Sequence, residues 1–352
     1  MESKNSLRGS THSAYHAASS MPVLGIDVSK RTLDACLLTD GDRHHCTVPN
    51  DDAGHHRLHA WASNVAAVYC ACLESTGSYG EAIAKHLFAE GVAVSLVNPS
   101  QTAAFARAQM LRTKTDRVDA ESIARFALAM LSQGELPRYE PRSPEQEALQ
   151  ELVRYRDALV AQRLQLTNRD QDAELKAVKR SNKKLVEAID REIKEAEREI
   201  KKLLEQHERL GRQYELLTSI PGVGAVTAAV ILSELPPVER FEHPAQVAAY
   251  AGVTPRIRHS GSRKPLSQLI TKTGNAFLRR TIYMAALTAK RLNPHLKAMA
   301  ERLHSKGKAP KKVIVAIMRK LMHLIYAILR DQVPFTTDHS ATDHKKVIAP
   351  AN

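Results

Sequence analysis

The stretch that decides the fold is PVLGIDV, Pro22–Val28, a short apolar run that contains one glycine and one carboxylate. Its length and composition predict a buried β-strand. Successive side chains of a strand point to opposite faces, so Asp27 shares a face with Val23 and Gly25. A charge in a buried strand is costly unless an opposite charge or hydrogen bonds balance it. Asp27 is therefore the first candidate for a functional residue.

Beyond this strand, an alternating α/β pattern continues to about Met130. Strand patterns flank the turn at Asp40–Gly41 and recur in VYCACLE (68–74) and VAVSLV (92–97), with helical periodicity after each of these segments. Three strands, a helix and two further strand-and-helix units are the element order of an RNase H-like sheet. The sequence predicts such an α/β domain over residues 21–135.

The rest of the chain has a different organisation. We expect a proline-bearing linker at 136–143, a coiled-coil helical arm at 144–216 and a mostly α-helical domain at 217–335. Apolar residues at heptad spacing predict that the arm is a helical hairpin, which we expect to bend near Ser181. A charged helix packed on one side is the alternative. The segments 1–20 and 336–352 are polar and predict disordered tails.

The charge balance favours a polyanionic partner. The 51 Lys and Arg residues outnumber the 38 Asp and Glu residues, which leaves a net charge of +13. Cations placed on phosphates release condensed counterions, so DNA, RNA or both are the expected partners. The most apolar tract is interrupted by Arg319 and Lys320, and no run reaches membrane-spanning length. We expect a cytoplasmic, nucleoid-associated protein.

The four cysteines lie in or beside apolar strand patterns. This placement is typical of reduced thiols that act as small core residues. Zinc is the alternative interpretation, because histidines lie near Cys46: His44, His45, His55 and His56. The chain has no C-x-x-C pair, so the spacing argues against a zinc site of the usual kind.

Three further carboxylates could join Asp27. Glu74 ends the VYCACLE strand, and Asp116 and Asp119 lie three residues apart at the start of a predicted helix. Oxygen ligands of this kind suit Mg²⁺ or Mn²⁺ at a scissile phosphate. The simpler interpretations remain open: Asp116 and Asp119 also suit a helix N-terminus, and Glu74 could be an exposed strand end.

Two features suggest contacts with phosphates. In SIPGVGAVTAA, Gly222 and Gly224 predict a helix-hairpin-helix turn that presents backbone N–H groups, although a plain glycine-rich connection is the alternative. In RIRHSGSRKP, Ser260 and Ser262 lie among cations, and a serine there either attacks a phosphate or only hydrogen-bonds to it. The predicted nucleic-acid-binding cations are Arg256, Arg258, Arg263, Lys264, Lys272, Arg279 and Arg280.

Eight segments stand in an order found in one family: GIDVSK, LESTGSYG, NPSQTAAFA, TKTDRVDA, SIPGVG, YAGVTP, HSGS and TKTGNAFLRR. From about Val23 to Phe335, the chain resembles the DEDD transposases of bacterial insertion sequences, relatives of pilin-gene invertases. Some of these are described as bridge-RNA-guided recombinases. The resemblance implies a RuvC-like domain, a coiled-coil arm and a helical transposase domain.

The resemblance also implies roles for individual residues. It assigns the metal-binding acids to Asp27, Glu74, Asp116 and Asp119, and the catalytic serine to Ser260 rather than Ser262. It further implies a noncoding guide RNA and a homo-oligomer, a dimer or tetramer, with composite active sites. Two other functions stay open: a metal-only nuclease similar to a junction resolvase, in which water attacks, and a noncatalytic nucleic-acid-binding scaffold.

Overall fold

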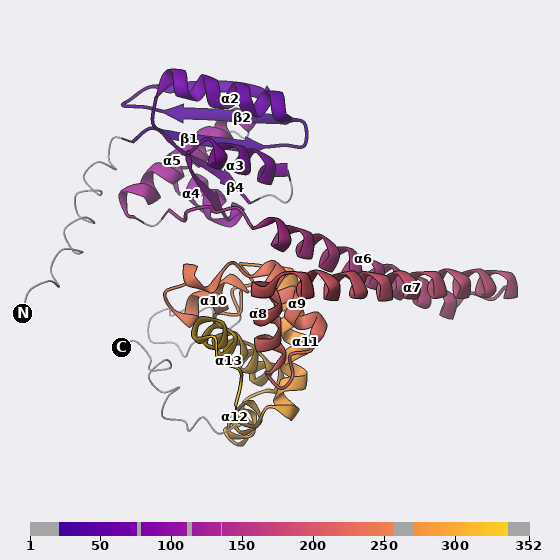
Figure 1. The fold of residues 1–352 in the computed structure, drawn as a ribbon. Helices are drawn as coiled ribbons and strands as arrows, with labels where there is room; N and C mark the ends of the chain where they lie inside the picture. The colour runs from indigo at the N-terminus through magenta and orange to yellow at the C-terminus, as the bar shows by residue number, and fades with distance from the viewer. Residues whose placement is uncertain (1–20, 76–78, 111–114, 135, 256–269, 337–352) are drawn as a thin grey trace, which may run out of the picture. The chain divides into compact units, whose positions relative to one another are not determined.

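A computed structural model describes residues 21–75, 79–110, 115–134, 136–255 and 270–336 (Figure 1). The chain divides at Pro141 into two compact units, and each is considered by itself. Within the described ranges, no helix is both long enough and apolar enough to cross a bilayer.

The N-terminal unit is built on a mixed five-stranded sheet with the strand order β3-β2-β1-β4-β5. β1 pairs with β2, and β2 with β3, in antiparallel fashion, whereas β4 and β5 are parallel to β1. This is the RNase H-like element order that the sequence predicts. The strands are β1 (Val23–Val28), β2 (Thr32–Leu38), β3 (Arg43–Pro49), β4 (Cys70–Glu74) and β5 (Ala93–Val97).

Helices cover both faces of this sheet. One face, which includes Leu24 and Ile26, packs against α2 (Asp52–Val65) and α3 (Tyr79–Ala89). The other face, which includes Val23, packs against α5 (Asp116–Ser132), and α4 (Pro99–Ala108) lies next to α5. Because neighbouring residues of β1 alternate between these two faces, Asp27 lies on the side that α5 covers.

Gly25 explains how closely α5 approaches β1. A Cβ atom at this position would lie 2.3 Å from the Ala120 carbonyl oxygen and 2.4 Å from the Ala124 nitrogen. Only a residue without a side chain leaves room for the helix backbone there. Thr115 is the N-cap of this helix, and its hydroxyl accepts a hydrogen bond from the Val118 N–H. Gly25 and this cap together bring the first turn of α5 to the end of β1.

The C-terminal unit begins with two long helices, α6 (Pro144–Asp172) and α7 (Lys176–Gln206). Arg156 pairs with Glu197 at 2.8 Å, and Arg163 pairs with Asp190 at 2.9 Å. From the first pair to the second, the residue number rises by seven on α6 and falls by seven on α7. The two helices are therefore antiparallel. The chain reverses at residues 173–175, and the predicted bend near Ser181 is wrong because that residue lies inside α7. The coiled coil itself stays a prediction.

The remaining helices enclose an apolar core around α13, whose buried side chains include Ile317, Leu321 and Ile325. Figure 1 labels these helices, apart from the short 3₁₀ turn η2 (Val238–Arg240). They are α8 (Glu208–Thr218), α9 (Ala225–Glu234), α10 (Pro244–Tyr250), α11 (Ala276–Leu292), α12 (Pro294–Ser305) and α13 (Pro310–Asp331). The helical character that the sequence predicts for this part of the chain is confirmed.

Candidate active site and nucleic-acid interface

Three carboxylates from two elements meet at one end of the sheet. Asp27 lies near the end of β1, and Asp116 and Asp119 lie in the first turn of α5. One oxygen from each side chain lies within 4.8 Å of the others. The meeting depends on the close approach of α5 at Gly25 and on the spacing of three residues, which puts both aspartates on one side of the helix.

Glu74 occupies the end of the neighbouring strand. Leu73 pairs with Ile26, so Glu74 and Asp27 are the next residues on adjacent parallel strands and lie at the same end of the sheet. Glu74 accepts a hydrogen bond from the Thr102 hydroxyl of α4, which orients its carboxylate. It lies outside the group of three whose oxygens fall within 4.8 Å of one another, but it is close enough to act on the pKa of Asp27.

The Asp27 carboxyl has a raised pKa of about 6. Burial is the largest cause, and repulsion from Asp119, Asp116, Glu74 and Asp34 follows in that order. Burial and like charges both disfavour the ionised form of a carboxyl group. The site therefore favours a cation, which would offset the repulsion.

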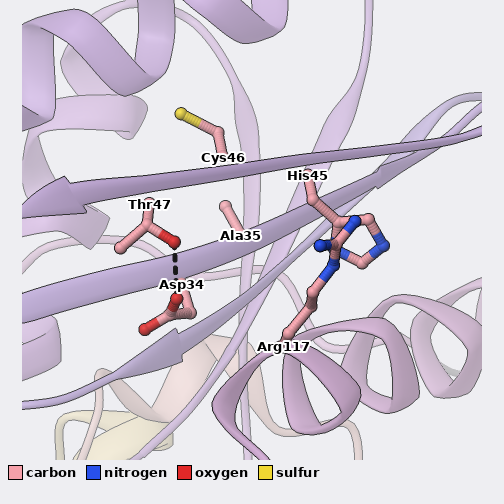
Figure 2. A pocket seen from close by; sticks show the side chains of 6 residues that line it. All are labelled: Asp34, Ala35, His45, Cys46, Thr47 and Arg117. Carbon is pink, nitrogen blue, oxygen red and sulfur yellow. Dashed lines mark hydrogen bonds between the residues drawn. The ribbon is translucent and has the colours of Figure 1, made fainter.

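Asp34 is a carboxylate that sequence reasoning missed. It lies opposite Asp27 on β2 and accepts a hydrogen bond from the Thr47 hydroxyl at 2.7 Å. Figure 2 shows this bond in a pocket whose lining also includes His45 and Arg117. Asp34 carries the same signal as Asp27, a lone acid in an apolar strand, so its position could have been found from the sequence.

The donor set fits a hard divalent cation. The converging groups are all carboxylates, which Mg²⁺ and Mn²⁺ prefer over imidazole or thiolate. Burial and the neighbouring acids raise the pKa of Asp27, and a bound cation would favour its ionised form. The metal would be held by Asp27, Asp116 and Asp119, with Glu74 at the adjacent strand end.

In the described part of the chain, the cysteines and the histidines around Cys46 do not come together as a group of three potential metal ligands. Cys36, Cys70 and Cys72 are buried, and burial raises the pKa of the Cys72 thiol to about 12. Neither group of potential metal ligands within the described ranges includes a cysteine. His55 and His56 lie on α2, and only His56 belongs to one of these groups.

The predicted helix-hairpin-helix turn connects α8 to α9. Gly222 has φ +103°, and a Cβ atom there would lie 2.4 Å from the Ala289 Cα of α11. Gly224 is the N-cap of α9, and no side chain caps this helix end. It is exposed, with no atom near its would-be Cβ. Gly222 is therefore required for the close packing against α11. The N–H groups that follow Gly224 are exposed, so a phosphate contact at this helix end stays a prediction.

Three predicted cations lie in the described part of the chain. Lys272 is exposed. Arg279 donates hydrogen bonds to the carbonyls of Ala251, at 3.2 Å, and Lys272, at 3.1 Å. Arg280 pairs with Asp157 of α6 at 2.6 Å and lies over the Phe277 ring. Arg279 thus has a structural role, whereas Arg280 is 60% exposed and retains access to a ligand.

The catalytic serine proposed from the sequence, Ser260, lies outside the described residues, as do Ser262, Arg256, Arg258, Arg263 and Lys264. The residues on either side of this segment pair with each other. Thr271 N–H donates to the Thr254 carbonyl at 2.9 Å, and Pro255 and Ile270 form an antiparallel bridge. The two ends of segment 256–269 are therefore held together.

A buried carboxylate connects residues that precede and follow these paired ends. Glu234, at the end of α9, is fully buried and receives two hydrogen bonds from Arg154, at 2.8 and 3.2 Å. Asn275 donates to the same carboxylate at 2.7 Å and caps α11. Tyr250 donates to the Glu234 carbonyl at 3.1 Å. Sequence reasoning missed Glu234, because the partners of its side chain, Asn275 and Arg154, lie 41 and 80 residues away along the chain.

The fold and site define a class of proteins that have an RNase H-like sheet with a carboxylate cluster at its strand ends. A transposase family model of the DEDD type matches residues 24–173, and a model described as "Transposase IS116/IS110/IS902 family" matches residues 214–301. The solved Thermus thermophilus RuvC, bound to a Holliday junction, matches 34% of this chain and 99% of its own, with 16% identity and a TM-score of 0.28.

Relatives matched over most of their length agree with the two family models. The pilin gene-inverting proteins of Moraxella lacunata and Moraxella bovis are each 30% identical to this chain over 317 residues, which covers 89% of this chain and 97% of each relative. The transposase of insertion sequence element IS1111A from Coxiella burnetii is 24% identical over 88% of this chain and 90% of its own. The chain belongs to the IS110-type DEDD transposase family, as its motifs predict.

Proposed function

We propose that this protein is the recombinase of an insertion sequence and that it cuts and rejoins DNA through a covalent link between Ser260 and a DNA phosphate. The observation that carries the phosphoryl-transfer part of the proposal is the convergence of Asp27, Asp116 and Asp119 within 4.8 Å. The covalent link rests on the family resemblance at Ser260. The Moraxella relatives are named for inverting a pilin gene, and inversion requires strands to be cut and rejoined.

In this proposal the carboxylates bind the metal ion. When bound, Mg²⁺ or Mn²⁺ would supply positive charge at the scissile phosphate. Asp27, Asp116 and Asp119 would hold the ion, and the hydrogen bond from Thr102 would keep Glu74 oriented toward the same strand end. Asp27 would act in its ionised form, so its pKa must fall from about 6 when a cation is present.

Ser260 has the nucleophilic role. Its Oγ would form a bond to phosphorus as the P–O bond to the leaving strand end breaks. The serine loses its proton, and the leaving oxygen gains one. The phosphodiester energy is then kept in the Ser260–DNA link for rejoining. The neighbouring cations Arg256, Arg258, Arg263 and Lys264 would neutralise the charge that develops on the phosphate.

The partners follow from the same proposal. The net charge of +13 suits donor and target DNA, and the family resemblance adds a noncoding guide RNA. The acids and Ser260 lie far apart in sequence, so we propose composite active sites in a homo-oligomer. If the protein, expressed with its own flanking noncoding DNA and then purified, carried no specific RNA, the guide RNA would have to be abandoned.

Covalent trapping tests the serine. Reactions stopped with denaturant should contain DNA joined to the wild-type protein and to the matched control Ser262→Ala, and none joined to Ser260→Ala. A normal yield of the adduct from Ser260→Ala would refute the nucleophilic role.

A metal-only nuclease is the second candidate, because the acidic cluster by itself suits water attack. In that case Ser260→Ala would still cut DNA, without an adduct in any variant. A noncatalytic scaffold would show no DNA processing that Asp27→Asn could abolish. Cutting by the wild type that is lost in Asp27→Asn would exclude the scaffold.

A further inference from the structure

A second group of metal-binding side chains lies on the opposite side of the sheet from the acidic cluster. His56 and His59 lie three residues apart on α2, and His86 and Glu90 lie four residues apart at the end of α3. Such spacings put both residues of a pair on one side of a helix. The two helices pack together on the Leu24 and Ile26 face of the sheet.

The distances within this group are short. The ligand atoms of His56, His86 and Glu90 lie within 4.8 Å of one another. The His56 and His86 rings are 4.4 Å apart between centroids, and the His59 Nε2 lies 3.9 Å from a Glu90 carboxylate oxygen. Ligands of a tetrahedral zinc ion are about 3.4 Å apart. Because His56 and Glu90 are exposed, their side chains can rotate to close this difference.

Two further observations favour a metal over simple ring packing. The Nε2 atom of His86 is buried and has no hydrogen-bond partner in the described part of the molecule. Buried polar atoms normally have a hydrogen-bond partner, and a bound metal ion would satisfy this nitrogen instead. In addition, the Nδ1 atom of His59 is 2.9 Å from the Tyr69 hydroxyl, which leaves its Nε2 directed at Glu90. Metal-bound histidines commonly have their second nitrogen fixed in this way.

Most donors of this group are imidazole nitrogens. Nitrogen-rich donor sets suit zinc and other borderline ions, whereas Mg²⁺ prefers oxygen.

We propose that His56, His59, His86 and Glu90 form a structural site for a divalent transition ion of the zinc type, with three imidazoles and one carboxylate as ligands. The site joins α2 to α3. It is separate from the carboxylates around Asp27, which lie on the face of the sheet that α5 covers.

Zinc binding tests the site directly. The full-length protein, stripped of metal, is titrated with Zn²⁺ against a chromophoric chelator, with excess Mg²⁺ present to occupy the acidic cluster. We expect one zinc equivalent whose affinity falls at least about tenfold in His56→Gln and in His86→Gln. The chain has 16 histidines, so the exposed His304→Gln serves as the matched control and should bind as the wild type does.

Two more readouts locate the ion. Co²⁺ in place of Zn²⁺ should give the intense visible bands of a tetrahedral site in the wild type and in His304→Gln, but not in His56→Gln. Zn²⁺ should also raise the unfolding midpoint reported by Trp61 of α2, the single tryptophan of the chain. His56 is exposed, so its replacement keeps the fold even where His86→Gln does not. Equal zinc affinity in the wild type and in His56→Gln would overturn the proposal.

Discussion

Asp27 and Asp34 lie directly opposite each other on the antiparallel strands β1 and β2. Like charges in this arrangement repel. The Thr47 hydroxyl stabilises Asp34 by a hydrogen bond at 2.7 Å, whereas burial and four neighbouring acids act against ionised Asp27. The protein therefore carries an electrostatic cost at this end of the sheet that a bound cation would offset.

That cost predicts a pH dependence of stability. The pKa of Asp27 is about 6 in the folded protein, against an ordinary value of 3.8, so the folded state binds this proton more tightly. Its contribution to stability is complete below about pH 4 and is lost as the pH rises through about 6. In metal-free buffer, Asp27→Asn should lack this loss and be more stable than the wild type at neutral pH.

Urea unfolding followed by Trp61 fluorescence measures this effect in the N-terminal unit. The exposed Asp42→Asn is the matched control and should follow the wild type. Excess Mg²⁺ should stabilise the wild type more than Asp27→Asn and so reduce the difference between them. If the free energy of unfolding of Asp27→Asn and of the wild type changed in the same way between pH 4 and pH 6, the proposed electrostatic cost at Asp27 would be wrong.

The Glu234–Arg154 pair predicts an asymmetry between two substitutions. Glu234 is fully buried, whereas the Arg154 side chain is 58% exposed. Arg154→Ala leaves a buried carboxylate without its cation and should cost about 3–5 kcal/mol. Glu234→Gln should cost less, about 1–2 kcal/mol, because Arg154 can reach water and the Gln oxygen can still accept from Asn275.

Urea denaturation followed by circular dichroism gives both values. Glu301→Ala, on the exposed side of α12, should change stability by no more than about 0.5 kcal/mol. If Arg154→Ala and Glu234→Gln lowered the free energy of unfolding by equal amounts, the predicted asymmetry would be wrong.

The two glycines of the α8–α9 turn should differ sharply. Gly222 combines φ +103° with a would-be Cβ 2.4 Å from the backbone of Ala289, so Gly222→Ala should cost at least about 2 kcal/mol. Gly224 has φ −87° and open space around it, so Gly224→Ala should change stability by less than about 1 kcal/mol. Thermal unfolding of the two variants gives the comparison, and similar midpoints would contradict it.

Arg279 and Arg280 should separate structural support from DNA binding. Arg279 bonds to the carbonyls of Ala251 and Lys272, so Arg279→Ala should speed hydrogen exchange at the Thr271 amide. Arg280 is exposed, so Arg280→Ala should leave that exchange unchanged and lower the salt dependence of DNA binding by about one unit of slope. If only Arg279→Ala changed the salt dependence of DNA binding, Arg279 and not Arg280 would be the residue that contacts DNA.

The sequence by itself determined what short-range rules govern. Strand alternation and the glycine turns involve residues within a few positions, so the order of elements and the family motifs could be read directly. Asp27 could be recognised because a lone acid in an apolar strand needs compensation. The site residues and the serine chemistry remain proposals.

Only the tertiary structure decided which distant residues meet. The carboxylates converge because Gly25 admits α5, Asp34 joins them through strand register, and Glu234 finds Arg154 across 80 residues. His56 was expected near Cys46 in the zinc interpretation, but helix packing puts it beside His86 instead. Contacts between elements depend on packing distance and register, which residue patterns within one element do not encode.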